Sequence, residues 1–198
     1  MFLDPASLSA RELSRLVISS VIPRPIALVT SVSEDGIVNA APFSFFNAVA
    51  SSPPILMISV DRKNGERKDT ARNILHSKEF VVHIVNEAIA DRMNITSANV
   101  PGTESEVLLA GFTLTGSVKI GTPRIVESPL HMECRFLHHV ELGTSPTDIL
   151  FGEVVAFHVR DEIYRDGKVD PVLLKAVGRL GGIQYCKTRD IFEMSRPK

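Results

Sequence analysis

Residues 130–142 read LHMECRFLHHVEL, and residues 149–159 read ILFGEVVAFHV. In the first segment, Met132, Cys134, Phe136, His138 and Val140 are expected on one face of a strand. They alternate with the polar residues His131, Glu133, Arg135 and His139. This is the period of a half-buried strand, so His131 and His139 are expected on its exposed face. In the second segment one face is expected to hold Phe151, Val155, Phe157 and Val159. Two long alternating strands in succession predict a protein built mainly from antiparallel sheet.

Shorter elements precede these strands. Four further strands are expected at Ile26–Val32, Ile37–Ala41, Ile55–Val60 and Phe80–Val85, whereas the aromatic segment 42–47 is expected to be a loop. Five short helices are expected. The first covers residues 9–20, the second is capped by Asp69 and runs to about Ser77, and the third is capped by Asn86 and runs to Met93. The fourth has a capping box of Thr103 and Glu106 and ends at Gly111, and the fifth begins at Asp170-Pro171. The pattern predicts a mostly β protein, a closed or nearly closed antiparallel barrel with short inserted helices.

Composition limits the function classes. The chain has 198 residues, enough for one sizeable core, and no repeat or linker divides it, so a single domain over 1–198 is expected. Lys and Arg number 22 against 23 Asp and Glu, and aromatic residues make up 6%. Neither a strong positive field nor a base-stacking surface is present, so nucleic acid is not an expected partner. No membrane span or signal peptide is visible, and a cytoplasmic location is expected.

No catalytic or metal-binding set stands out. Cys134 and Cys186 are too few for a disulfide scaffold or a zinc knuckle, and we expect two reduced thiols. The histidines have no metal-ligand spacing. No acid, base or nucleophile group can be assigned, so the catalytic residues remain unknown. An enzyme of this kind commonly leaves the chemistry to a cofactor.

The most informative polar segment is 61–74, DRKNGERKDTARNI. Four cations precede a predicted helix N-terminus, where free backbone N–H groups and the helix dipole favour an anion such as a phosphate monoester. Thr70 adds a hydroxyl in the first turn. The alternative is a solvated charged loop with an ordinary cap, and the Asp69 carboxylate competes for the same N–H groups.

Two other segments have the composition of a ligand site. Residues 39–47, NAAPFSFFN, combine small residues with Ser and Asn side chains and three phenylalanines, as a flat ligand would require. The alternative is a core segment with a proline break. Residues 178–185, GRLGGIQY, bring three glycines together and predict a tight backbone path against a ligand or another chain, or else a flexible turn.

Together these segments resemble the flavin reductase-like FMN-binding proteins, a family that includes flavoredoxins. The likeness lies in RPIALVTS at 24–31, residues 39–47, Pro53-Pro54, Lys68-Asp69-Thr70 with Asn73-Ile74, and GRLGG with Tyr185. It covers about residues 21–185. An N-terminal helical segment at 9–20 precedes this region. The resemblance implies a six-stranded antiparallel Greek-key split barrel, usually a homodimer with FMN near the subunit interface.

The resemblance also implies a set of cofactor-binding residues. Thr30 and Ser31 would lie beside the flavin, and residues Ser44, Phe45, Phe46 and Asn47 would line the isoalloxazine and ribityl chain. The phosphate would be held by Ser59, Arg62, Lys63, Lys68, Asp69 and Thr70. Arg179 and Tyr185 would complete the pocket or reach the cofactor across the dimer.

Members of the family differ in how they use the flavin. In one interpretation the chain is an NAD(P)H-dependent oxidoreductase, with hydride transfer to flavin N5 and reduced FMN supplied to a monooxygenase. In another it is a flavoredoxin-like carrier that keeps its FMN, uses no nicotinamide and passes electrons to a redox partner protein. A third is a non-catalytic flavin-binding or interaction protein. The C-terminal Gly178–Gly182 segment lacks the His-Gly-like element of typical reductases.

Overall fold

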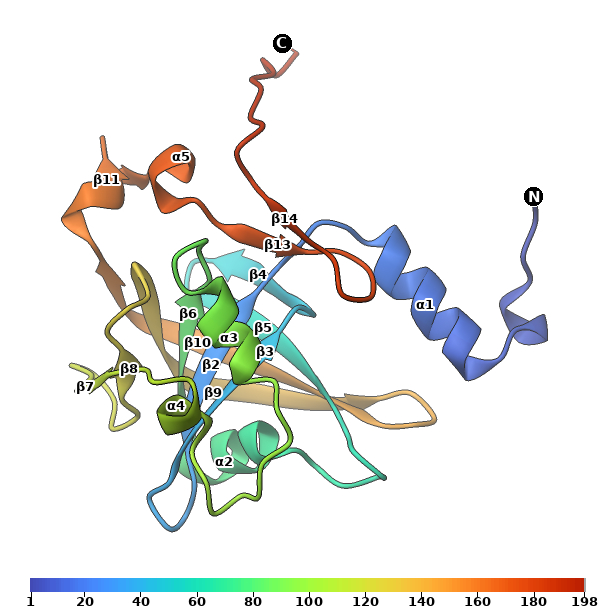
Figure 1. Cartoon of the computed structure of the whole chain (residues 1–198), viewed down its shortest axis with the longest axis horizontal. Coiled ribbons are helices and arrows are strands. Elements are labelled where there is room, and N and C mark those ends of the chain that lie inside the picture. Colours follow the sequence, from blue (N-terminus) through green and yellow to red (C-terminus); the bar gives the residue numbers. More distant parts are fainter. Residues whose placement is uncertain (198) are drawn as a thin grey trace.

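The computed structural model describes residues 1–197, and a seven-stranded antiparallel sheet forms its centre (Figure 1). The strand order is β3–β2–β6–β9–β10–β5–β4. The strands are β2 (Ala27–Val32), β3 (Val38–Phe43), β4 (Phe46–Ser51), β5 (Pro54–Asp61), β6 (Glu79–Ile84), β9 (Leu130–Leu142) and β10 (Thr147–Val159). The mostly β prediction is confirmed.

The sheet curls into a split barrel because its two edges are adjacent in the chain. The edge strands β3 and β4 are joined by Ser44 and Phe45 alone. A flat sheet of this size would hold its edges roughly 29 Å apart, whereas so short a connection spans roughly 10 Å. The Phe45 carbonyl accepts a hydrogen bond from Ser59 N–H on β5 (2.8 Å), which fixes the turn between the two edges.

Strand β4 corrects the expectation that residues 42–47 form a loop, and with it the expected count of six strands. β3 continues to Phe43, and β4 begins at Phe46. Only Phe46 is buried in β4, and the rest of the strand is exposed. A strand exposed on both faces has no alternation of apolar and polar residues, so the pattern that reveals β9 and β10 is missing here.

Shorter elements surround the barrel. The helices are α1 (Ala10–Ser20), α2 (Asp69–Ser77), α3 (Ala90–Ile95), α4 (Glu106–Leu109) and α5 (Pro171–Leu174), with 3-10 turns at Pro5–Ser7 and Asp161–Ile163. The minor sheets are β1 (Arg24–Pro25) with β13 (Val177–Arg179) and β14 (Tyr185–Lys187), β7 (Leu114–Thr115) with β8 (Arg124–Ile125), and β11 (Tyr164–Arg165) with β12 (Lys168–Val169). Helices α2, α3 and α4 pack against β3, while α1 stands away from the barrel (Figure 1). No helix in residues 1–197 has the length and apolar character needed to span a membrane.

Three expected helix caps are wrong. Lys68, not Asp69, is the N-cap of α2, and Ile89, not Asn86, is the N-cap of α3. Ser105 precedes α4, and there is no capping box because the Glu106 carboxylate turns inward to Asn39 and Ala40. The cap at Asp170 is confirmed, since its side chain accepts from Val172 N–H and Leu173 N–H.

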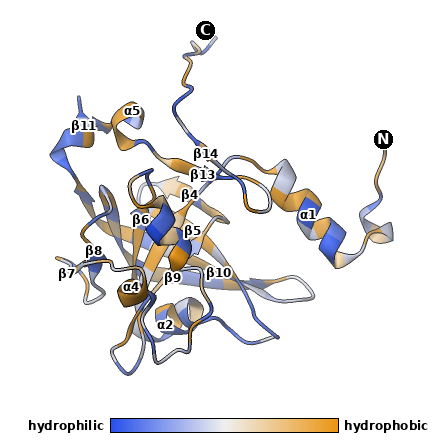
Figure 2. Cartoon of the chain, viewed as in Figure 1, coloured by the Kyte–Doolittle hydropathy of each residue, from blue (hydrophilic) through white to orange (hydrophobic). Residues whose placement is uncertain are grey.

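The barrel interior holds a core drawn from all seven strands, and Figure 2 shows the apolar residues concentrated there. The face of β10 that points inward carries Leu150, Gly152 and Val154, not the expected set, and Phe157 is 57% exposed. Register shifts between β9 and β10 change the faces along the strand. The first half of β9 is buried on both sides, so the expected exposure of His131 is wrong.

Candidate functional site

A polar groove runs along the place where the edges of the barrel meet. It consists of three adjoining cavities of about 450, 250 and 250 Å³, and Pro42 and Phe43 line all three. The groove brings together nine residues of the predicted cofactor site, namely Ser44, Phe45, Ser59, Lys63, Lys68, Asp69, Thr70, Arg179 and Tyr185. Segments from β3, β5, α2 and the β13–β14 turn therefore reach one surface.

The largest cavity contains the N-terminus of α2. Its N-cap is Lys68, whose side chain makes no capping hydrogen bond. The Asp69 carboxylate pairs with Arg72 and does not cap the helix. A lysine at an uncapped N-terminus adds positive charge to the positive end of the helix dipole, an unfavourable arrangement unless an anion binds there. The donor chemistry of this end of the groove fits a phosphate group.

The four cations of segment 61–68 divide into two pairs. Arg62 and Arg67 both bond to Asp148 (3.0 Å each) and to Glu141. These contacts lower the pKa of the buried Asp148 to about 2, against the opposing effect of burial. Lys63 and Lys68 make no ion pair within residues 1–197, and both line the groove. Arg62 is thus held by a structural ion pair, and the two lysines carry the charge available to a ligand.

The other end of the groove has an apolar wall and a cationic rim. Phe45 is 36% exposed, and the Arg24 guanidinium lies 5.7 Å from its ring centroid. Arg179 stacks on Tyr185 at 4.3 Å. This end of the groove fits a flat aromatic ring beside polar groups.

Phe46 and Asn47 do not line the groove. Phe46 belongs to the barrel core. Asn47 is exposed on β4, where its side-chain oxygen accepts from Ala48 N–H.

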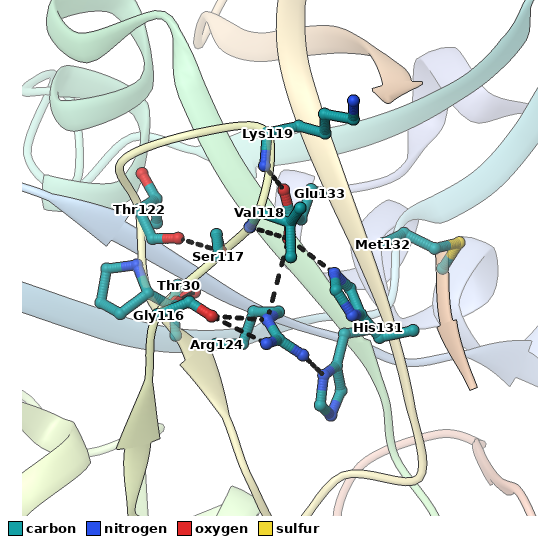
Figure 3. A network of polar contacts seen from close by, with 12 residues as sticks. Thr30, Gly116, Ser117, Val118, Lys119, Thr122, Arg124, His131, Met132 and Glu133 are labelled. Carbon is teal, nitrogen blue, oxygen red and sulfur yellow. Dashed lines mark hydrogen bonds and ion pairs between the residues drawn. The ribbon is translucent and has the colours of Figure 1, made fainter. Parts of the chain in front are cut away.

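Thr30 and Ser31 are fully buried and do not line the groove, so their expected place beside a flavin stays a prediction. Thr30 Oγ1 donates to the Pro123 carbonyl (2.7 Å), and Ser31 Oγ donates to Asn39 Oδ1 (3.3 Å). Neither is accessible to a ligand without rearrangement. Figure 3 shows that Thr30 instead helps to hold the segment 116–124.

The same segment is anchored by a buried carboxylate. Glu133 accepts from Val118 N–H (2.8 Å), Lys119 N–H (2.7 Å) and His158 Nε2 (2.6 Å), as Figure 3 partly shows. These bonds lower its pKa against the effect of burial. Arg124 donates to His131 Nδ1 in the same network, so His131 is neutral and donates from Nε2 to the Ser128 carbonyl. This network holds the loop 116–124 in place.

Two residues at the floor of the groove were missed as site residues. Asn39 was included only as the start of a segment, and Glu106 was assigned to a helix cap. They hydrogen-bond each other from β3 and α4, at 2.9 Å to each carboxylate oxygen. Because the contact joins residues 67 positions apart, no local pattern indicates it. Arg24, also missed, donates to the carbonyls of Ile18, Val21 and Leu180 and ties α1 to the groove rim.

The acidic cluster beside segment 61–68 does not support a metal centre, and Cys134 is not a reactive thiol. His139, Glu141 and Asp148 place ligand atoms within 4.8 Å of one another, but Arg62 and Arg67 already neutralise both carboxylates. Burial raises the pKa of the Cys134 thiol, which makes it a poor nucleophile. The groove therefore offers binding and orientation, and a bound cofactor would have to supply the redox chemistry.

Comparison with known proteins agrees with this geometry. Residues 18–180 match the flavin reductase like domain family. The chain is similar to nitrilotriacetate monooxygenase component B from Bacillus cereus, with 42% identity over 98% of each chain and a TM-score of 0.96. It is 37% identical to 2-nitrobenzoate 2-nitroreductase NbaA from Pseudomonas fluorescens, over 100% of this chain and 96% of the other, with a TM-score of 0.91. A flavin reductase with a split barrel domain from Shewanella frigidimarina NCIMB 400 shares the fold over the full length of both chains, at 21% identity and a TM-score of 0.87. On the match over residues 18–180, the chain belongs to the flavin reductase-like family.

Proposed function

We propose that this protein binds FMN in the groove and acts as an NAD(P)H-dependent flavin oxidoreductase. The observation that carries the proposal is the near full-length likeness to a monooxygenase component B at 42% identity. The groove supports it, since a cationic helix N-terminus adjoins an aromatic wall. Bound FMN would supply the electron transfer, with hydride accepted at flavin N5.

The chain's own residues would bind and orient the cofactor. Lys63 and Lys68 would neutralise the phosphate, which the backbone N–H groups at Asp69 and Thr70 would also bind. Ser44 and Ser59 would bond the ribityl chain, and Phe45 would cover the isoalloxazine. Arg179 and Tyr185 would close the ring end of the groove. Arg62 would act indirectly, by fixing the loop through Asp148.

We propose a monooxygenase as the recipient of reduced flavin, because the likeness to component B covers almost the whole chain. A second candidate is supported by the 37% identity to 2-nitrobenzoate 2-nitroreductase NbaA. In that case the flavin would stay bound and reduce a nitroaromatic substrate in the same groove. An electron carrier with tightly bound FMN and no use of nicotinamide is the third.

We also propose that the protein is a homodimer with FMN near the interface. Strand β4 is an edge strand whose residues Asn47–Ser51 are all exposed, and none of them is charged. Natural edge strands are normally protected by charge, proline or a covering segment. β4 begins beside Phe45 in the groove, so a second copy on β4 would lie next to the bound cofactor.

An anaerobic absorption experiment tests the function. Purified protein is mixed with FMN and freed of unbound flavin, and NADH or NADPH is then added. Bleaching of the bound flavin by either nicotinamide is the expected result. Bleaching by dithionite alone would leave the electron carrier as the function. A protein that binds no flavin even in the presence of excess FMN would refute both. Addition of 2-nitrobenzoate to the reduced protein separates the nitroreductase from the flavin supplier, because only the former reoxidises the flavin without oxygen.

A further inference from the structure

Glu106 is a buried carboxylate without a cationic partner at the floor of the groove. Its residue is 6% exposed. The two carboxylate oxygens accept from Asn39 Nδ2 at 2.9 Å each, and Oε2 also accepts from Ala40 N–H at 3.1 Å. It takes part in none of the ion pairs within residues 1–197. Burial of an unpaired negative charge is costly, so this group is easily protonated.

Asn39 connects Glu106 to the first turn of α2. Its Oδ1 accepts from Thr70 Oγ1 at 2.8 Å, while its Nδ2 donates to Glu106. All three residues line the largest cavity of the groove. In this arrangement the hydroxyl proton of Thr70 is used by Asn39, and the hydroxyl cannot donate to an anion at the helix N-terminus.

The charged groups around the cavity do not neutralise Glu106. Segment 61–68 contributes Lys63, Glu66, Arg67 and Lys68, and α2 contributes Asp69 and Arg72. β3 and segment 96–100, which also line the cavity, bring no charged side chain. Burial and the nearby Asp69 raise the pKa of Glu106, although the hydrogen bonds from Ala40 and Asn39 oppose this effect.

We propose that Glu106 takes up a proton from solvent when the phosphate group of FMN binds, and that this proton switches Thr70 into a phosphate donor. The proposal rests on the proposed function, because it assumes that FMN is the ligand of the groove. Protonated Glu106 donates to Asn39 Oδ1 after the Asn39 amide turns over. Asn39 Nδ2 then donates to Thr70 Oγ1 and to Ser31 Oγ, the two hydroxyls that donate to Asn39 Oδ1 before the amide turns. The Thr70 O–H is thereby free for the phosphate. The repulsion between the phosphate and a buried carboxylate is removed in the same step.

The test is calorimetric titration with FMN between pH 7 and pH 8.5, in two buffers of different ionisation enthalpy. We expect the wild-type protein to take up as much as one proton per FMN, and its affinity to fall by up to about tenfold per pH unit. Glu106→Gln presents an amide N–H to Asn39 as the protonated acid would, so it should bind FMN without this proton uptake and with little pH dependence. Titration of the phosphate itself is common to both proteins and cancels in the comparison.

Matched controls separate Glu106 from general charge effects. Glu104→Gln removes the same charge from an exposed position two residues away and should behave as wild type. Riboflavin, which lacks the phosphate, should bind the wild-type protein without proton uptake. Equal proton uptake by the wild type and Glu106→Gln would overturn the proposal and leave the proposed function intact. Failure of the wild type to bind FMN would refute both.

A second measurement needs no variant, should Glu106→Gln fold poorly. Infrared difference spectra of the wild-type protein should gain the C=O stretching band of a protonated carboxyl group on FMN binding. The band should be absent with riboflavin. Its absence with FMN would contradict the proposal.

Discussion

Lys68 is the residue on which the proposed phosphate subsite depends most directly. It occupies the N-cap of α2, where a lysine is electrostatically unfavourable without a bound anion, and it forms no ion pair within residues 1–197. We expect Lys68→Ala to weaken FMN binding by about tenfold or more, since hydrogen bonds to charged groups contribute about 1.5–3 kcal/mol. Flavin fluorescence quenching measures the dissociation constant.

Thr70→Ala tests the same subsite through the hydroxyl, with a smaller expected loss because the backbone N–H groups remain. Lys168→Ala is the matched control for Lys68, since Lys168 is exposed on β12 and does not line the groove. Riboflavin affinity should be unchanged in all three variants. If Lys68→Ala and Thr70→Ala both bind FMN as tightly as the wild type, the phosphate lies elsewhere.

His83 and His131 make the stability depend on pH. Burial lowers their pKa values to about 3 and about 4, and each is held neutral by hydrogen bonds. Below about pH 6.5 the unfolded chain binds protons at these two sites and the folded protein does not. The free energy of unfolding should therefore fall as the pH drops from 6.5 to 5, each histidine contributing at most about 1.4 kcal/mol per pH unit.

The raised pKa of Glu106 has the opposite effect on the free energy of unfolding over part of this range. The wild type is therefore compared with a variant that lacks one histidine. Urea unfolding of the wild type and His131→Gln at pH 5, 6, 7 and 8 isolates the contribution of His131. The difference between the two proteins should become less favourable to the wild type as the pH falls. A constant difference would mean that His131 titrates normally in the folded protein.

Among the elements, β10 depends on a glycine at its centre. A Cβ atom at Gly152 would lie 2.4 Å from Phe80 Cζ and 3.1 Å from Cys134 Cβ, inside the barrel core. We expect Gly152→Ala to lower the free energy of unfolding by about 1–3 kcal/mol, because the core must shift to admit the methyl group. Chemical denaturation measures the change.

Gly116→Ala provides the control, because its Cβ would meet no atom within 4 Å. It should unfold as the wild type does. Adding Phe80→Leu to Gly152→Ala should cost less than the sum of the two single changes, since the smaller side chain makes room. Strict additivity would show that the ring is not the source of the strain.

Alternation predicted the strands that have one buried face, and it failed where burial is decided by distant segments. β9 and β10 were predicted almost to their ends, whereas β4 has no buried face and was missed. His131 lies on a strand paired with both β6 and β10, opposite His83 and His158, and these distant partners are not revealed by the sequence around it. Both faces of β10 carry apolar residues, and Leu150, Gly152 and Val154 alternate regularly on the buried one, so alternation alone does not tell which face points inward.

The candidate site was predictable where its residues are close in sequence. Segment 61–70 shows its charge and its helix start directly, and the structure places Lys63, Lys68 and Thr70 in the groove. The pairing of Arg62 with Asp148 and the contact of Asn39 with Glu106 join distant positions, so neither could be read from local spacing.

At the scale of the whole molecule, the exposed edge of the barrel and the unburied α1 predict a partner. α1 buries none of its residues although it is amphipathic, and β4 is exposed and uncharged beyond Phe46 (Figure 1). If a second copy covers β4, then Val49→Glu should convert the dimer to a monomer, because the interface would have to bury an unpaired charge. Light scattering coupled to size exclusion gives the mass.

The Val49→Glu monomer should keep its fold, because Val49 is 49% exposed in the single chain. Val172→Glu on α5 is the control: this residue is 62% exposed, and the variant should remain dimeric. The monomeric variant should also bind FMN more weakly, since β4 begins beside Phe45 at the groove. A wild-type protein that is monomeric with FMN bound would refute the dimer.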